Sequence, residues 1–130
     1  MILDYDLIRK ILFKIEEISD GFSGKPIKDI YEEYFPQVEC KVFKYHVKYL
    51  VDIKYLDASP FWPPYISDIS PQGREYLNAI RSETTWKKIN EKLLKPFGNV
   101  SFSVILRLLP DILKNLIWIY HSNIFLFASI

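Results

Sequence analysis

The sequence predicts a mainly helical α+β protein, with a winged helix-turn-helix core, a short β-hairpin wing and a C-terminal helical extension. Within residues 5–53, apolar residues recur at helical spacing in three segments. Two short β-like runs then flank a proline-rich tip, and helical patterns return after them. Three helices, a hairpin and further helices, in this order, are typical of a winged helix with an added helical part.

We expect two domains. Residues 1–82 are predicted to form the winged helix-turn-helix domain, and residues 83–130 the helical extension, which either packs on that domain or mediates dimerisation. The chain has 130 residues, of which 49% are apolar, so it has enough apolar side chains for a hydrophobic core.

The first two helices are separated by a cluster of helix breakers. Helical spacing predicts the first helix over residues 5–19, with Arg9 on its polar face. Ser, Asp and Gly residues at positions 19–24 end it. Pro26 suits the first turn of a short second helix, and Pro36 ends that helix.

The third helix is predicted over residues 38–53, after a connection short enough for a helix-turn-helix. Its polar side carries three lysines. Its apolar stripe is expected to contain five residues: Val42, His46, Tyr49, Leu50 and Ile53.

A hairpin is predicted next, with strands at residues 54–58 and 65–69. Three of the six residues between them, at positions 59–64, are prolines, which cannot donate to a β ladder, so this segment is expected to form a stiff aromatic tip. Ser70 then suits an N-cap and Pro71 the first position of a fourth helix.

Two further helices are predicted after the fourth. Thr84 or Thr85 is expected to begin the fifth, which Pro96 and Gly98 end. Ser101 is expected to cap the sixth, and Pro110 to kink or split it. The predicted inner face of the sixth helix contains Leu106, Leu109, Leu113 and Leu116.

The residues expected to bind double-stranded DNA lie mainly on the third helix, opposite its apolar stripe. In a helix-turn-helix this helix enters the major groove, where lysines reach phosphates and guanine edges. Two more lysines lie near the start of the second helix, where backbone N–H groups also favour a phosphate. The predicted contacts are Lys25, Lys28, Lys41, Lys44, Tyr45 and Lys48. The alternative is that these lysines only make the surface soluble.

The predicted wing favours a second interpretation. Asp57 and Asp68 flank it, and no Lys or Arg lies between positions 55 and 74. Phe61, Trp62 and Tyr65 are therefore more readily explained as core residues or dimer contacts than as DNA contacts, and such an aromatic tip can also bury against a protein. This supports a protein-interaction module, for instance a phage inhibitor of a host defence or transcription protein.

The sequence offers no credible catalytic or metal site, and we expect neither an enzyme nor a cofactor. His46 lies on the apolar stripe and is expected to be a hydrogen-bonded core residue, because no second ligand follows at a suitable spacing. Cys40 is expected to be a buried thiol. A single cysteine and the lack of an export signal favour a cytoplasmic protein, and no small-molecule substrate is expected.

The last fifteen residues are strongly apolar. His121, Ser122 and Asn123 interrupt the run, so a membrane span is not expected. Such a surface either packs on the core or joins two subunits, and a homodimer also suits DNA binding. The predicted dimer contacts are Leu116, Trp118, Tyr120, Phe125 and Phe127.

Three segments carry a resemblance to a known family: residues 6–12 (DLIRKIL), 45–50 (YHVKYL) and 69–77 (ISPQGREYL), with further similarity at Ala79–Arg81 and Trp86. Across residues 4–109 the chain resembles the DUF2513 family of short bacterial and prophage proteins, to which a winged-helix-like fold is assigned. The family has no assigned activity. The resemblance therefore implies the fold and, with the lysines of the third helix, a DNA-binding transcriptional regulator of phage or mobile-element origin.

Overall fold

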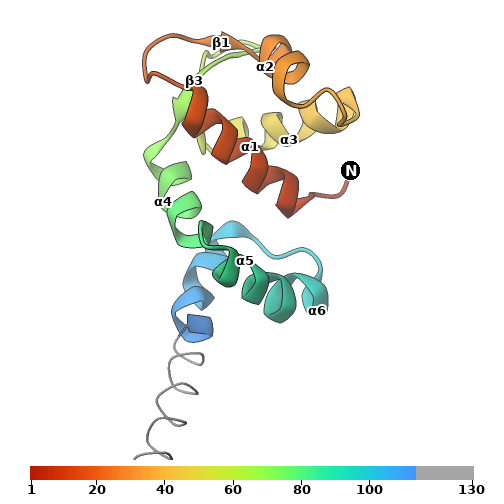
Figure 1. Ribbon diagram of the computed structural model, residues 1–130, viewed down its shortest axis with the longest axis vertical. Helices are drawn as coiled ribbons and strands as arrows, with labels where there is room; N and C mark the ends of the chain where they lie inside the picture. The colour runs from red at the N-terminus through yellow and green to blue at the C-terminus, as the bar shows by residue number, and fades with distance from the viewer. Residues whose placement is uncertain (114–130) are drawn as a thin grey trace, which may run out of the picture. The chain divides into compact units, whose positions relative to one another are not determined.

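The structure, a computed structural model, describes residues 1–113 of the 130. The chain divides into two compact units, Met1–Leu77 and Asn78–Ile130, which we call unit 1 and unit 2. The protein is mainly helical with one small antiparallel sheet, so the predicted α+β class is confirmed (Figure 1).

Unit 1 contains the predicted order of three helices, a hairpin and a fourth helix, with one additional strand. The elements are α1 (Tyr5–Ile18), β1 (Lys25–Pro26), α2 (Ile27–Tyr34), α3 (Cys40–Asp52), β2 (Leu56–Ala58), β3 (Tyr65–Ile69) and α4 (Pro71–Ile80). The unit boundary falls inside α4.

The strand that the sequence did not predict is β1. Its two residues pair antiparallel with β3, Lys25 opposite Ile66 and Pro26 opposite Tyr65. The sheet order is therefore β1-β3-β2. Two residues, one of them proline, carry no alternating pattern, so only the pairing with β3 defines this strand.

The first helix, α1, supplies much of the core of unit 1. Asp4 caps it, because its side chain accepts the backbone N–H groups of Asp6 at 3.0 Å and Leu7 at 3.1 Å. The expected polar position of Arg9 is wrong. This side chain is only 7% exposed, with its guanidinium 4.9 Å from the centre of the Phe13 ring, so α1 is covered over a wider arc than its apolar stripe alone predicts.

The buried stripe of α3 is rotated from the predicted one. His46 and Leu50 are buried as expected, but Val42, Tyr49 and Ile53 are only partly buried. Phe43 and Val47 complete the core instead. The stripe is rotated because α3 packs against α1, α2 and β2. The Phe43 ring fills the space between Tyr31 and Phe35, with ring centroids 5.2 and 5.1 Å away.

His46 is the hydrogen-bonded core residue that the sequence predicted. Its ring is fully buried. Nδ1 lies 2.7 Å from the Val42 carbonyl oxygen, and Nε2 accepts the backbone N–H of Asp4 at 2.8 Å. Nε2 therefore holds the start of α1 against α3, Nδ1 is engaged within α3 itself, and neither nitrogen is left for a metal ion.

The hairpin has an exposed tip, and β3 has the predicted bounds, but β2 begins at Leu56 rather than at Lys54 because Lys54 lies in a turn with a positive φ of 63°. Leu56 pairs with Ile69 and Asp57 with Asp68. Phe61 and Trp62 in the tip are 54% and 47% exposed, so of their two expected roles that of core residues is wrong. Tyr65, at the start of β3, is 46% exposed. The prolines hold the tip away from the core, where these rings contact solvent.

The passage from β3 into α4 follows the sequence prediction. The Ser70 hydroxyl accepts the Gly73 N–H at 3.0 Å and donates to the Lys54 carbonyl at 2.6 Å. Pro71 begins α4, and Tyr76 and Leu77 are fully buried. Ser70 thus caps α4 and ties it to the chain just before the hairpin.

Unit 2 begins with one continuous run of helix. Its segments are α5 (Glu83–Ile89), the π-helical turn η1 (Asn90–Leu94) and α6 (Lys95–Phe97), followed by a helix over the described residues 102–113. The predicted start of α5 at Thr84 or Thr85 is wrong. Ser82 is the N-cap, and its side chain accepts the Thr85 N–H at 3.3 Å.

The last described helix differs from its prediction in two ways. It continues through Pro110, so the predicted split does not occur. Its buried face contains Phe102, Ile105, Leu109 and Ile112, whereas Leu106 and Leu113 are only partly buried. Ser101 lies at its start as predicted, accepting the Val104 N–H at 3.3 Å.

Among residues 1–113, no helix has both the length and the apolar character that crossing a membrane requires.

Candidate functional site

The lysines of α3 lie on its exposed side, as the sequence predicted. Lys41, Lys44 and Lys48 are all exposed. Lys48 forms an ion pair with Asp52 at 2.9 Å, one turn further along α3. Lys41 and Lys44 form no ion pair with any residue in 1–113. Two of the three cations are thus available to an external anion without breaking an internal contact.

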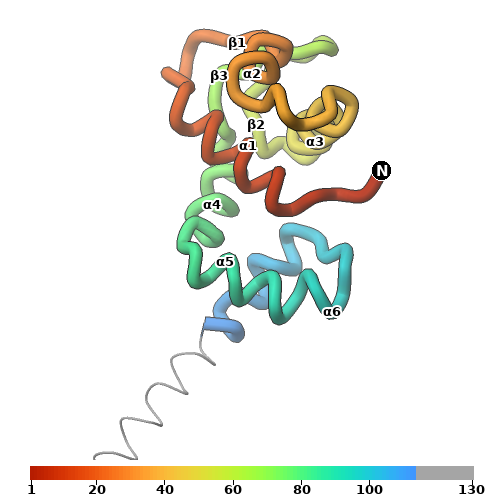
Figure 2. Tube along the Cα trace, turned by 45° about the vertical axis from the view of Figure 1, so that its right-hand side comes forward, coloured from red at the N-terminus to blue at the C-terminus, as the bar shows by residue number. Residues whose placement is uncertain are grey.

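The turn between α2 and α3 is held by a side-chain hydrogen bond. The Tyr31 hydroxyl of α2 donates to the Val38 carbonyl oxygen at 2.5 Å. Residues 35–39 connect the two helices closely (Figure 2). This contact and the Tyr31–Phe43 ring contact set the direction of α3, and therefore the direction in which its lysines extend.

The remaining predicted DNA contacts lie in different surroundings. Lys28, on the first turn of α2, is exposed and lies 3.9 Å from Glu32. Lys25 is partly buried in β1, where it pairs with Ile66. Tyr45 is partly buried, and its ring makes an edge contact with His46 at 5.5 Å between centroids.

An apolar groove connects the predicted DNA-binding residues with the predicted protein-binding residues. Its volume is about 570 Å³, and it lies between α2, α3 and the hairpin tip. Its lining contains Pro26, Ile27, Lys28, Tyr31, Glu32, Cys40, Phe43, Lys44, Phe61, Pro63, Pro64 and Tyr65. Two lysines from the first set and two aromatic residues from the second therefore line one groove.

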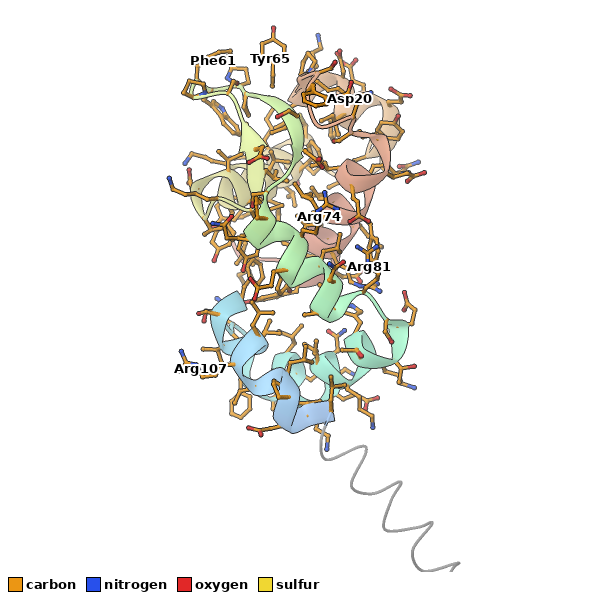
Figure 3. All side chains as sticks on the ribbon, turned by 90° about the vertical axis from the view of Figure 1, so that its left-hand side faces the viewer. Asp20, Phe61, Tyr65, Arg74, Arg81 and Arg107 are labelled. Atoms are coloured by element: carbon orange, nitrogen blue, oxygen red, sulfur yellow. The ribbon has the colours of Figure 1, made fainter. Side chains whose placement is uncertain are left out.

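The aromatic wall of this groove is formed by the hairpin. The Phe61 and Tyr65 rings meet edge to face, with centroids 5.8 Å apart. Both side chains extend from the outer end of the hairpin (Figure 3). The sequence did not single out Tyr31, Phe43, Pro63 or Pro64 as site residues. The high aromatic and proline content of the tip was the signal in the sequence that could have indicated this groove. The position of the tip beside α2 depends on contacts between distant segments, which a local pattern does not contain.

Trp62 lies apart from this groove. It lines a second hollow of about 590 Å³ on the other side of the tip, together with Lys48, Lys54 and Asp57. Phe61 contributes to both hollows. The three aromatic residues predicted to bind a protein therefore do not share one surface.

A comparison with protein families gives one match. The model of the family described as "Hypothetical protein (DUF2513)" matches residues 2–99. The chain belongs to the DUF2513 family. The match includes all of unit 1 except Met1 and continues through α6 of unit 2. No curated protein and no solved structure matches this DUF2513 chain.

The remaining predictions for this DUF2513 chain concern Cys40, metal-binding side chains and the dimer contacts. Cys40 is only partly buried, which corrects the expectation of a buried thiol, and it lines the apolar groove. Residues 1–113 contain no group of three or more His, Cys, Asp or Glu side chains placed to hold a metal ion. The predicted dimer contacts, Leu116, Trp118, Tyr120, Phe125 and Phe127, lie outside the described residues.

Proposed function

We propose that this protein is a sequence-specific DNA-binding transcriptional regulator of phage or mobile-element origin, and that unit 1 acts as a winged helix-turn-helix. The order α1, β1, α2, α3, β2, β3 agrees with that proposal, since α2 and α3 correspond to the helix-turn-helix and the hairpin to the wing. In this arrangement α3 is the recognition helix.

The charge of α3 is the observation that carries the proposal. From Cys40 to Val51 the helix contains three lysines and no acidic residue. On α1 and α2, in contrast, the exposed cations Lys10 and Lys28 lie within 4 Å of a carboxylate. Lys41 and Lys44 lack such a partner among the described residues. Lysines without a carboxylate partner attract phosphates, and their side chains are long enough to reach base edges.

The first test is a selection from a random duplex library by the full-length protein. We expect one sequence to be enriched, because α3 presents Tyr45 and three lysines to a single groove. If the protein is a dimer, the enriched sequence contains two inverted half-sites about 10 base pairs apart. Recovery of unenriched duplex in every round contradicts sequence-specific recognition. Recovery of a single unrepeated half-site contradicts only the dimer.

A second candidate function is binding to another protein through the groove between α2, α3 and the hairpin tip. The observation favouring it is the exposure of Phe61 and Tyr65 beside a groove with an apolar floor. Exposed aromatic side chains next to an apolar pocket are typical of protein interfaces. A host defence or transcription protein is the partner class we propose for this case.

Replacing Phe61 by alanine tests this second candidate. The substitution removes one wall of the groove, so a discrete complex cross-linked in bacterial cells is expected to disappear. Phe22 is a matched control, because it is 92% exposed on the loop between α1 and β1 and lines no part of the groove. A complex that survives Phe61→Ala, or that Phe22→Ala also abolishes, excludes the groove as its binding site.

A further inference from the structure

The two units carry opposite net charge. Residues 1–77 contain 10 Lys and Arg against 13 Asp and Glu, whereas residues 78–130 contain 7 against 3. Unit 1 therefore has a net charge of −3 and unit 2 a net charge of +4, which add to the +1 of the whole chain. The unit that carries α3 repels a polyanion at long range, and unit 2 attracts one.

The positive charge of unit 2 is concentrated on one helical run. Four of its lysines lie within nine residues of α5, η1 and α6: Lys87, Lys88, Lys92 and Lys95. Trp86, Ile89 and Leu93 of the same run are buried. Lys87, Lys92 and Lys95 are exposed and Lys88 is partly buried, so the cations occupy the solvent side. We call these four residues the lysine face.

The lysine face is not neutralised by any residue in 1–113. None of its four side chains forms an ion pair with a residue in the described part of the chain. On α1 and α2, in contrast, Lys10, Lys14 and Lys28 each lie within 4 Å of a carboxylate. Glu91 is the one acidic residue between Lys87 and Lys95 in sequence, and it leaves the local charge positive.

The spacing of the lysine face suits the phosphates of a duplex. Lys87 and Lys95 are eight residues apart, which on a helix corresponds to about 12 Å. Phosphates on one strand of B-DNA advance about 3.4 Å along the axis per nucleotide. The face is thus long enough to follow several consecutive phosphates of one strand, and its flexible lysines need no fixed register.

We propose that the lysine face is a second DNA contact, which binds the phosphate backbone without reading sequence. The proposal rests on the proposed function, because α3 in unit 1 supplies the specific contact. Unit 2 then provides most of the long-range attraction that the acidic unit 1 lacks. Anionic lipid is the competing occupant of such a surface, and the test below separates the two.

The experiment replaces Lys87 and Lys95 by glutamine in the full-length chain. Binding is measured by fluorescence anisotropy against a mixed-sequence duplex and against the duplex enriched in the selection, over a series of salt concentrations. We expect binding to both duplexes to be weaker by somewhat less than about 100-fold at about 0.1 M salt. The slope of log Kd against log salt should fall by about 2, because two phosphate contacts are lost. The control variant Lys10→Gln/Lys14→Gln removes the same charge from α1 and is expected to keep the slope.

The outcomes distinguish this proposal from the proposed function. If the salt slope is unchanged in Lys87→Gln/Lys95→Gln, the lysine face is not a DNA contact, even where substitutions on α3 abolish binding. If the slope falls but substitutions on α3 have no effect, the lysine face stands and the role of α3 is wrong. An unchanged slope combined with loss of sedimentation with phosphatidylserine vesicles overturns the proposal in favour of a membrane surface.

Discussion

Replacing Lys44 and Lys48 by glutamate is expected to weaken binding to the selected duplex on the order of 100-fold at about 0.1 M salt. Two phosphate contacts account for most of this loss, because each contributes about 0.9 to the slope of log affinity against log salt. The two introduced carboxylates add repulsion from the same phosphates. Binding is measured by electrophoretic shift at one fixed salt concentration.

This double variant is expected to fold normally. Lys44 forms no ion pair within the described residues. The ion pair of Lys48 with Asp52 joins two side chains that are each more than half exposed, and such pairs contribute at most about 1 kcal/mol. Circular dichroism and thermal unfolding should therefore match the wild-type protein.

The control for this prediction reverses the same number of charges on a different helix. Lys10 and Lys14 lie on α1, where each already has a carboxylate partner. The variant Lys10→Glu/Lys14→Glu is expected to lose much less affinity than Lys44→Glu/Lys48→Glu. Equal losses in the two variants would mean that only the overall charge of the protein determines its affinity for DNA. In that case α3 is not the recognition helix.

Much of unit 1 could be predicted because local rules determine it. Pro36 follows the end of α2, and Ser70 with Pro71 begins α4. Each of these signals needs only a few neighbouring residues. The exposure of Lys41, Lys44 and Lys48 followed from helical periodicity. Any packing of α3 that buries His46 and Leu50 leaves these three lysines on its exposed side.

The features that the sequence did not give depend on contacts between distant segments. The strand β1 exists through its pairing with β3, forty residues later. Phe43 replaces Val42 in the core because the rings of Tyr31 and Phe35 leave space for it. The apolar groove requires the hairpin tip to lie beside α2. Periodicity within one helix contains none of this information.

Replacing Gly73 by alanine is expected to destabilise the protein by about 3 kcal/mol or more. Helix propensity alone predicts the opposite sign, since alanine in place of glycine inside a helix stabilises it by about 1 kcal/mol. The difference comes from Tyr55, whose backbone passes against the first turn of α4. A Cβ atom on Gly73 meets the Tyr55 carbonyl oxygen at 2.1 Å and its carbonyl carbon at 3.0 Å.

Neither side of this contact can move easily. The Tyr55 carbonyl oxygen accepts the Ser70 N–H at 2.9 Å, and the Ser70 hydroxyl donates to the neighbouring Lys54 carbonyl. A shift of either backbone therefore breaks hydrogen bonds that join α4 to the start of the hairpin. Gln72→Ala, at the adjacent exposed position of α4, is the matched control, and its free energy of unfolding in urea should stay within about 0.5 kcal/mol of wild type. If Gly73→Ala proves as stable as Gln72→Ala, α4 and Tyr55 do not approach this closely.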